Sequence, residues 1–349
     1  MPIALSTSSA GQTFALADAV ELVHVARNGF VESRTAGAAV VTGPDGAVLV
    51  ALGPAEAPIY PRSTLKPFQA IASLRHGARL ESEALAIACG SHRGTVRHQE
   101  LAARMLADAG LDPSALQCPP DWPADADELA RYAAEAGPEA RRTPLAYNCS
   151  GKHAGFLAAC TASGHDVGTY LDPQHPVQRE VEAVIEEYCG EPVTQTGVDG
   201  CGAPAAVVSL SGLARGIGRV AGAPSRPDAE PHAAAVAEAM LAHPWAVQGE
   251  TSSNTVVMRE LGLLAKLGAD GVMVMAAPDG TAVAVKALDG GTRAGNLVAL
   301  SLMARFAPEH VDRERWASVV EQVRPKILGR GEPVGSVELA APVRAVVDA

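Results

Sequence analysis

Strand-like segments lie at both ends of the chain with helix-like segments between them, and this order restricts the possible folds more than any other feature. Residues 20–53 contain β-rich runs that flank the turn signal Pro44-Asp45-Gly46, which predicts a hairpin over residues 38–53. A second pair of such runs flanks Pro278-Asp279-Gly280. Strands and helices do not alternate regularly, which argues against a doubly wound parallel sheet. We therefore expect an α+β fold in which N- and C-terminal strands form one antiparallel sheet and a helical lobe is inserted.

A chain of 349 residues can bury a sizeable core, and we expect one catalytic domain over residues 1–349. Its sheet region should cover about 20–62 and 250–349, and its helical lobe about 63–249. Within the lobe, the spacing of apolar residues predicts a helix that starts near Leu65 and another over residues 205–216.

The charge and hydropathy of the chain exclude several classes of protein. The net charge is −11 and no basic stripe is present, which argues against a nucleic-acid binder. No apolar run reaches membrane-spanning length, so we expect no membrane partner. The N-terminus lacks a positively charged leader followed by an apolar block, and we expect a cytoplasmic protein without a signal peptide.

The segment RSTLKPFQ places Ser63 and Lys66 three positions apart at a helix start. On a helix the two side chains share a face, and a neutral lysine amine could take the proton of the hydroxyl. Bringing a lysine pKa from about 10.4 to about 7 requires roughly 4–5 kcal/mol of desolvation or like-charge repulsion. Taken alone, the spacing is more typical of a serine helix cap with a solvated lysine.

Two further segments carry candidate polar groups. CGSHRGT places Ser91 and His92 in a glycine-flanked turn suited to presenting a hydroxyl into a cleft. AVAVKALDGG places Lys286 at the end of an apolar strand, followed by Asp289 and two glycines. A polar loop and an edge-strand lysine are the alternative interpretations.

The segments YNCSGKHAG and VDGCGAP each carry a cysteine in a tight loop before a predicted helix. Zinc prefers thiolate and imidazole ligands in tetrahedral geometry. Cys149 and Cys201, with a third ligand from Lys152 or His153, would leave a fourth position for water or substrate. The chain lacks a C-x-x-C pair that would make this signal strong.

Six separated blocks occur in one order: RSTLKPFQ, CGSHRGT, NCSGKHAG, VDGCGAP, KLGADGV and AVKALDGGTRA. From about Val20 to Phe306 the chain thereby resembles the asparaginase family typified by the inducible rhizobial enzyme. The family's fold is similar to that of serine β-lactamases and penicillin-binding proteins, which agrees with the order of strands and helices.

The resemblance implies hydrolysis of L-asparagine to L-aspartate and ammonia. We also expect a homodimer. The resemblance also implies two Ser-Lys pairs, Ser63 with Lys66 and Ser91 with Lys286. A zinc site of two cysteines and a lysine, one ion per chain, maps onto Cys149, Lys152 and Cys201. The residues that we expect to contact substrate are Arg62, His92, Asp199 and Asp289.

We expect acyl transfer in which Ser63 attacks the side-chain amide and Lys66 accepts its proton, with Ser91 as the alternative nucleophile. Two other functions stay open. One is an acyl hydrolase of the penicillin-recognising type, although K-A-L-D-G-G departs from that group's K-T-G. The other is a non-catalytic protein that binds zinc or an amino acid.

Overall fold

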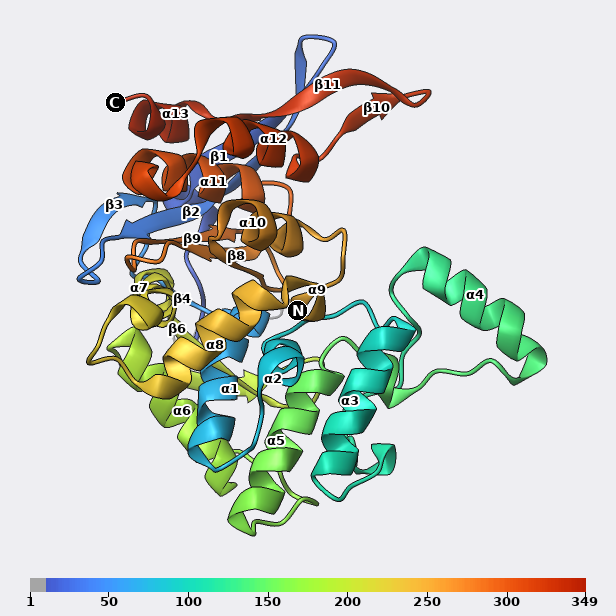
Figure 1. The fold of residues 1–349 in the computed structure, drawn as a ribbon. Helices are drawn as coiled ribbons and strands as arrows, with labels where there is room; N and C mark the ends of the chain where they lie inside the picture. The colour runs from blue at the N-terminus through green and yellow to red at the C-terminus, as the bar shows by residue number, and fades with distance from the viewer. Residues whose placement is uncertain (1–10) are drawn as a thin grey trace, which may run out of the picture.

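Strands from the two ends of the chain form one antiparallel sheet, in the computed structural model that describes residues 11–349 (Figure 1). The order is β10-β11-β1-β2-β9-β8-β7, and β3 also pairs with β2. The strands are β1 (Val20–Arg27), β2 (Phe30–Thr42), β3 (Val48–Leu52), β7 (Leu264–Leu267), β8 (Val272–Ala276), β9 (Ala282–Ala287), β10 (Ile327–Gly329) and β11 (Glu332–Leu339). This confirms the α+β class and both predicted hairpins. The expected absence of a signal peptide concerns in part residues 1–10, which lie outside the described residues.

Strand β2 joins the two halves of the sheet. Its first part pairs with β1, its last part pairs with β3, and its other edge pairs with β9. The approach at Gly37 is close, because an added Cβ would lie 2.1 Å from the Lys286 carbonyl oxygen. Glycine is therefore required where β2 crosses β9.

Helices cover both faces of the sheet (Figure 1). On one face α11 packs on β8 and β9, and on the other α7 packs on β2 and β9. The C-terminal helices are α10 (Ser253–Leu261), α11 (Gly295–Phe306), α12 (Arg313–Val323) and α13 (Ala341–Val347).

Beyond α7 lies a group of helices with a small sheet of order β4-β6-β5. The helices are α1 (Lys66–Arg75), α2 (Ser82–Ala88), α3 (Val96–Asp108), α4 (Ala126–Ala136), α5 (Ser150–Ser163), α6 (Pro176–Cys189), α7 (Leu210–Gly222), α8 (Pro231–Ala242) and α9 (Pro244–Val247). The strands are β4 (Pro58–Ile59), β5 (Gln195–Val198) and β6 (Pro204–Ser209). In Figure 1, α4 projects from the other helices as an arm.

The predicted helix over residues 205–216 is wrong in its first part. Residues 204–209 form β6 between β4 and β5, and the helix α7 starts only at Leu210. The β-branched Val207 and Val208 are buried in this strand. Ser209 then caps α7, because its hydroxyl accepts the Gly212 N–H at 2.9 Å.

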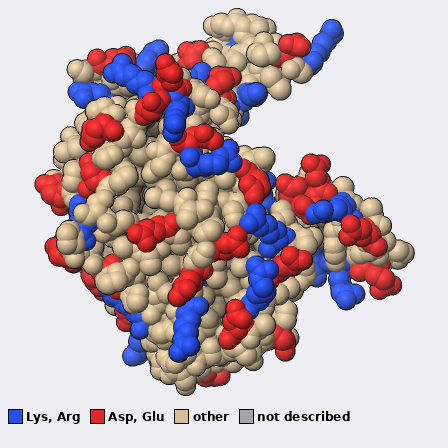
Figure 2. Space-filling view, viewed as in Figure 1, with Lys and Arg blue, Asp and Glu red and all other residues tan. Residues whose placement is uncertain are grey.

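Acidic and basic side chains are interspersed on the face drawn in Figure 2, without a large patch of one sign. Within residues 11–349 no helix is both long enough and apolar enough to cross a membrane.

Candidate active site

Two buried lysines converge on one serine hydroxyl. Ser91 Oγ accepts a hydrogen bond from Lys66 Nζ at 3.0 Å and another from Lys266 Nζ at 3.0 Å. Ser91 lies in the loop after α2, Lys66 begins α1, and Lys266 lies on β7. Neither lysine side chain is exposed by more than 1%. The loop is fixed by its backbone, since the Ser91 N–H donates to the Val247 carbonyl at 2.7 Å.

The environment of Lys266 favours the neutral amine. Burial, followed by the charge of Lys66, lowers the pKa of Lys266 well below its ordinary value. A neutral amine has a lone pair that can accept a proton, which a charged ammonium cannot do. Lys266 is therefore suited to act as a base toward Ser91.

The expected pairing of Ser91 with Lys286 is wrong. Lys286 Nζ donates to the Asp270 carbonyl at 2.8 Å and to the carbonyl of Ala287. On β8, Val272 pairs with Lys286 of β9 and Val274 pairs with Lys266 of β7. Paired residues point to the same face of a sheet, as do residues two apart on one strand, so both lysine side chains leave the same face. They are nevertheless two strands apart, about 10 Å, and only Lys266 reaches Ser91.

The expected pairing of Ser63 with Lys66 is also absent among the described residues, because Lys66 Nζ bonds the Gly90 carbonyl and Ser91 Oγ. Ser63 lies half-buried in a short 3-10 helix, Arg62–Leu65, directly before α1. The residue before it, Arg62, has a φ of 56°. This left-handed conformation is strained for arginine, and such strain is concentrated at functional sites.

Ion pairs hold Arg62 in that conformation. Its Nε and Nη2 donate to Asp199 Oδ1 at 3.0 and 2.7 Å, and its Nη1 donates to Asp270. Burial opposes ionisation of Asp199, but the hydrogen bond from Arg62 and the charge of Lys152 hold the Asp199 pKa below its ordinary value. Arg62 and Asp199 are thus brought together beside Ser63.

Cys149, Lys152 and Cys201 gather in a second buried cluster. Cys149 is the residue before α5, Lys152 lies in its first turn, and Cys201 lies in the turn between β5 and β6. Lys152 Nζ donates to Cys201 Sγ at 2.9 Å, and each of the three residues is at most 5% exposed. The pKa of Cys149 lies well below its ordinary value. The hydrogen bond with Cys201 lowers this pKa most, the charges of Lys66 and Lys152 lower it further, and burial opposes them.

The histidines of both motifs have hydrogen-bond partners outside these two clusters. His92 Nε2 lies 2.9 Å from Ser150 Oγ, and its Nδ1 accepts the Gly94 N–H at 3.0 Å. With both ring nitrogens engaged, His92 positions its loop, and its contact with substrate stays a prediction. His153 Nδ1 lies 2.7 Å from the Tyr170 hydroxyl.

Asp289 lies in the turn after β9, where its Oδ1 accepts the Gly291 N–H at 2.9 Å. The pKa of Lys286 is lowered by burial, and the charges of Asp270 and Asp289 offset part of that shift. No hydrogen bond joins Asp289 to Arg62 or Ser91 in the part of the chain that the structure describes.

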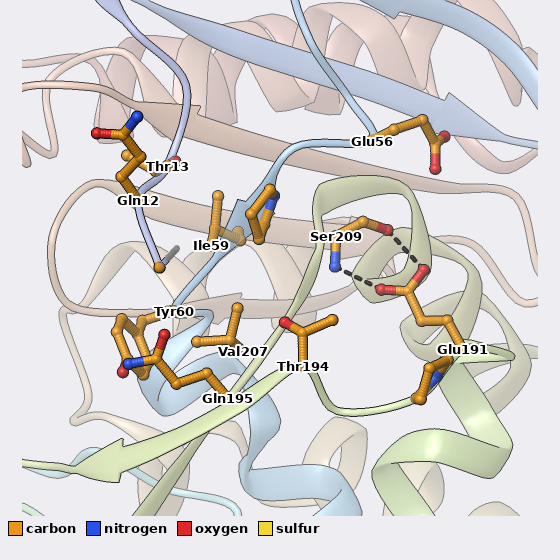
Figure 3. A pocket seen from close by; sticks show the side chains of 13 residues that line it. Gln12, Thr13, Glu56, Ile59, Tyr60, Glu191, Thr194, Gln195, Val207 and Ser209 are labelled. Atoms are coloured by element: carbon orange, nitrogen blue, oxygen red, sulfur yellow. Dashed lines mark hydrogen bonds between the residues drawn. The ribbon is translucent and has the colours of Figure 1, made fainter. Parts of the chain in front are cut away.

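A separate cavity of about 450 Å³ opens beside the small sheet (Figure 3). Ile59 and Val207 form apolar parts of its wall, and Glu191 at its side is bonded to Ser209. None of the lysines or cysteines described above lines it. This cavity is therefore distinct from the lysine and cysteine clusters.

Sequence reasoning missed two residues of the site, Lys266 and Asp270. Both lie within KLGADGV, a block used only to recognise the family. A lysine inside the apolar run LLAKLG was a usable signal, because a buried strand rarely contains a charge without a function.

The family model of L-asparaginase II matches residues 23–339, so the chain belongs to the L-asparaginase II family. This confirms the resemblance to an asparaginase family, and it makes the chain an amidohydrolase by family.

Solved structures that match the chain include two of the protein Mglu and one of a β-lactamase. Mglu in its native form is 13% identical with a TM-score of 0.44, covering 78% of this chain and 64% of that one. Mglu in its glutamate form is 14% identical with a TM-score of 0.44, covering 78% and 60%. The β-lactamase, from Mycobacterium bovis, is 16% identical with a TM-score of 0.36, covering 78% and 94%.

The chain thus spans less than two thirds of the length of the Mglu chains that it matches. Among proteins with curated descriptions, none matches the chain.

Proposed function

We propose that the chain hydrolyses the side-chain amide of L-asparagine through a serine nucleophile and a buried neutral lysine. The observation that carries this proposal is the position of Ser91 Oγ, 3.0 Å from the amines of both Lys66 and Lys266. Family membership supports asparagine as the substrate.

In the proposed reaction the serine oxygen attacks the amide carbon while its proton passes to a lysine amine. The tetrahedral intermediate collapses when the same lysine returns the proton to the leaving nitrogen, which departs as ammonia. Water then cleaves the β-aspartyl ester, with the lysine again acting as base, and releases aspartate. A well-placed donor to the oxyanion contributes about 3–4 kcal/mol to such a step.

Hydrogen bonding favours Ser91 as the nucleophile over Ser63, which the sequence favoured. The strained backbone at Arg62 and the position of Lys66, three residues on, keep Ser63 as the second candidate. In that case Lys66, Ser91 and Lys266 would form a chain of hydrogen bonds that carries the proton away from Ser63.

Alanine variants of the two serines separate these assignments. We expect Ser91→Ala to lower kcat for ammonia release from asparagine by at least about 10³-fold, as removal of a nucleophile does. Ser63→Ala should lose less, and peptide mapping of acid-quenched Ser63→Ala should find the β-aspartyl ester on Ser91. Ser73→Ala is the control, because Ser73 is a buried serine of α1 whose hydroxyl, within residues 11–349, bonds only the Gln69 carbonyl.

An inactive Ser63→Ala beside an active Ser91→Ala would reverse the assignment. Near wild-type turnover in both variants would contradict a serine mechanism.

We also propose that Cys149, Lys152 and Cys201 hold one zinc ion. The donor set fits, since two buried thiols and a buried amine converge, and the Lys152–Cys201 contact of 2.9 Å brings two of them together. Bound zinc would supply Lewis-acid polarisation and orientation. A bound ion would need both sulfurs as thiolates and the amine neutral. Without the ion the charges of Cys201 and Cys149 outweigh burial and raise the Lys152 pKa, so metal uptake should release protons.

A further inference from the structure

The ion pair between Arg62 and Asp270 lies at the edge of the candidate site. Arg62 is the neighbour of Ser63, and Asp270 lies in the turn between β7, which carries Lys266, and β8. The pair therefore joins the segment that carries Ser63 and Lys66 to the segment that carries Lys266.

The Asp270 side chain is exposed although its backbone is held rigidly. Asp270 has a φ of 54° and Gly271 a φ of 71°, which defines a tight left-handed turn. Lys286 Nζ donates to the Asp270 carbonyl at 2.8 Å and anchors that turn. The Asp270 side chain is nevertheless 60% exposed, against 18% for Asp199. Asp270 is thus a fixed carboxylate that faces solvent.

The two carboxylates hold different edges of the guanidinium. Asp199 accepts from Nε and Nη2, and Asp270 accepts from Nη1 alone. If the contact with Asp270 opens, Arg62 keeps its position through Asp199. Its Nη1 is then free for another anion, and the carboxylate of Asp270 is free for a cation.

The charges of an α-amino acid match this arrangement. The α-carboxylate of such a molecule is a suitable acceptor for Arg62, and its α-ammonium is a suitable donor to Asp270. The ion pair satisfies both protein groups while the site is empty, and the zwitterion satisfies both when it enters. Leaving either charge without a partner would cost binding energy, which penalises molecules that lack one of the two groups.

We propose that Asp270 is a specificity residue that binds the α-ammonium group of the substrate in exchange for its contact with Arg62. The substrate class is then free α-amino acids with a side-chain amide. N-acylated asparagine and asparagine within peptides lack the ammonium and are poor substrates. This inference rests on the proposed function, because it assigns part of the same site.

The test compares L-asparagine with succinamate, which has the same amide and carboxylate but no α-ammonium. Asp270→Asn preserves the turn, because asparagine tolerates the left-handed conformation, but it removes the charge. We expect kcat/KM for L-asparagine to fall about 10- to 100-fold, mainly through KM, while kcat/KM for succinamate changes less than about threefold. Asp45→Asn, at the exposed turn between β2 and β3, is the matched control and should change neither.

Equal losses for both substrates in Asp270→Asn would show a purely structural role for Asp270 and overturn the proposal, as would no loss for either. If wild-type protein releases ammonia from neither substrate, the proposed function has failed. Titration calorimetry with L-aspartate and succinate then tests Asp270 by itself. Wild-type protein should prefer L-aspartate and Asp270→Asn should lose that preference, whereas an unchanged preference would overturn the assignment.

Discussion

Buried lysines are the costliest residues of this site. Lys66, Lys152 and Lys266 are at most 3% exposed, and in residues 11–349 their nitrogens bond hydroxyl, carbonyl and thiol groups and no carboxylate. Burial disfavours the charged form of Lys266 and lowers its pKa, whereas at Lys152 the charges of Cys201 and Cys149 outweigh burial and raise the pKa. The fold therefore gives up stability at Lys266, where a neutral amine is useful.

Replacing Lys266 with methionine tests this at a single residue. The folded-state pKa of Lys266 is lowered, whereas in the unfolded chain it is about 10.4, so the unfolded state binds a proton that the folded state lacks. Stability from this group should therefore rise with pH between the two pKa values, by about 1.4 kcal/mol per pH unit. In Lys266→Met that contribution is absent.

Urea unfolding of both proteins at about pH 6.5, 7.5 and 8.5 measures how their free energies of unfolding differ with pH. The free energy of unfolding of the wild type should rise relative to that of Lys266→Met as the pH increases. Asparagine hydrolysis should be lost in the variant. Parallel pH dependences would mean that Lys266 is charged in the folded protein.

The arm that carries α4 differs from every other element near the site. No residue of α4 is buried, and its principal contacts are with the adjoining 3-10 helix. At its base, Asp121 and Thr143 form an antiparallel bridge, and the Ala124 N–H donates to the Arg93 carbonyl at 2.8 Å. The base is thus tied to the loop of Ser91, while the arm itself adds little to the core.

Replacing residues 125–141 with Gly-Ser-Gly-Ser should change the free energy of unfolding by no more than about 1 kcal/mol, because exposed segments contribute little. Thermal unfolding and asparagine hydrolysis of the shortened protein check this. A loss of several kcal/mol would show that α4 packs on another part of the protein or on a second copy.

At the scale of the whole molecule, the proposed metal ligands join parts that are distant in the chain. Cys149 and Lys152 come from the start of α5, and Cys201 comes from the turn between β5 and β6. An ion that binds only the folded arrangement stabilises it by mass action, by about 4 kcal/mol at a thousand times its dissociation constant.

Removal of zinc should therefore lower the melting temperature of the wild-type protein by several degrees. The melting temperature of Cys201→Ser should not change. Metal analysis before and after dialysis against a chelator, with calorimetry of each sample, makes the comparison. A wild-type protein that carries no zinc and whose melting temperature does not respond to added zinc would contradict the proposal.

The order of strand-like and helix-like segments was sufficient to predict the α+β class, because each hairpin is a local structure with its own turn signal. The motif spacing likewise brought Cys149 and Lys152 onto one helix start, where residues three apart share a face. Local pattern failed at β6, since a short apolar run such as AAVV suits a strand or a buried helix equally well.

The partners of Ser91 were decided only by tertiary structure. Lys266 and Lys286 both lie on apolar strands and leave the same face of the sheet, and nothing local distinguishes them. The strand order places β7 beside Ser91 and keeps β9 two strands away. By itself the sequence determined which residue types this protein has for its chemistry. Pairing between distant strands selected which of them meet, because contacts across a sheet depend on strand order and register, and neither is encoded in one segment alone.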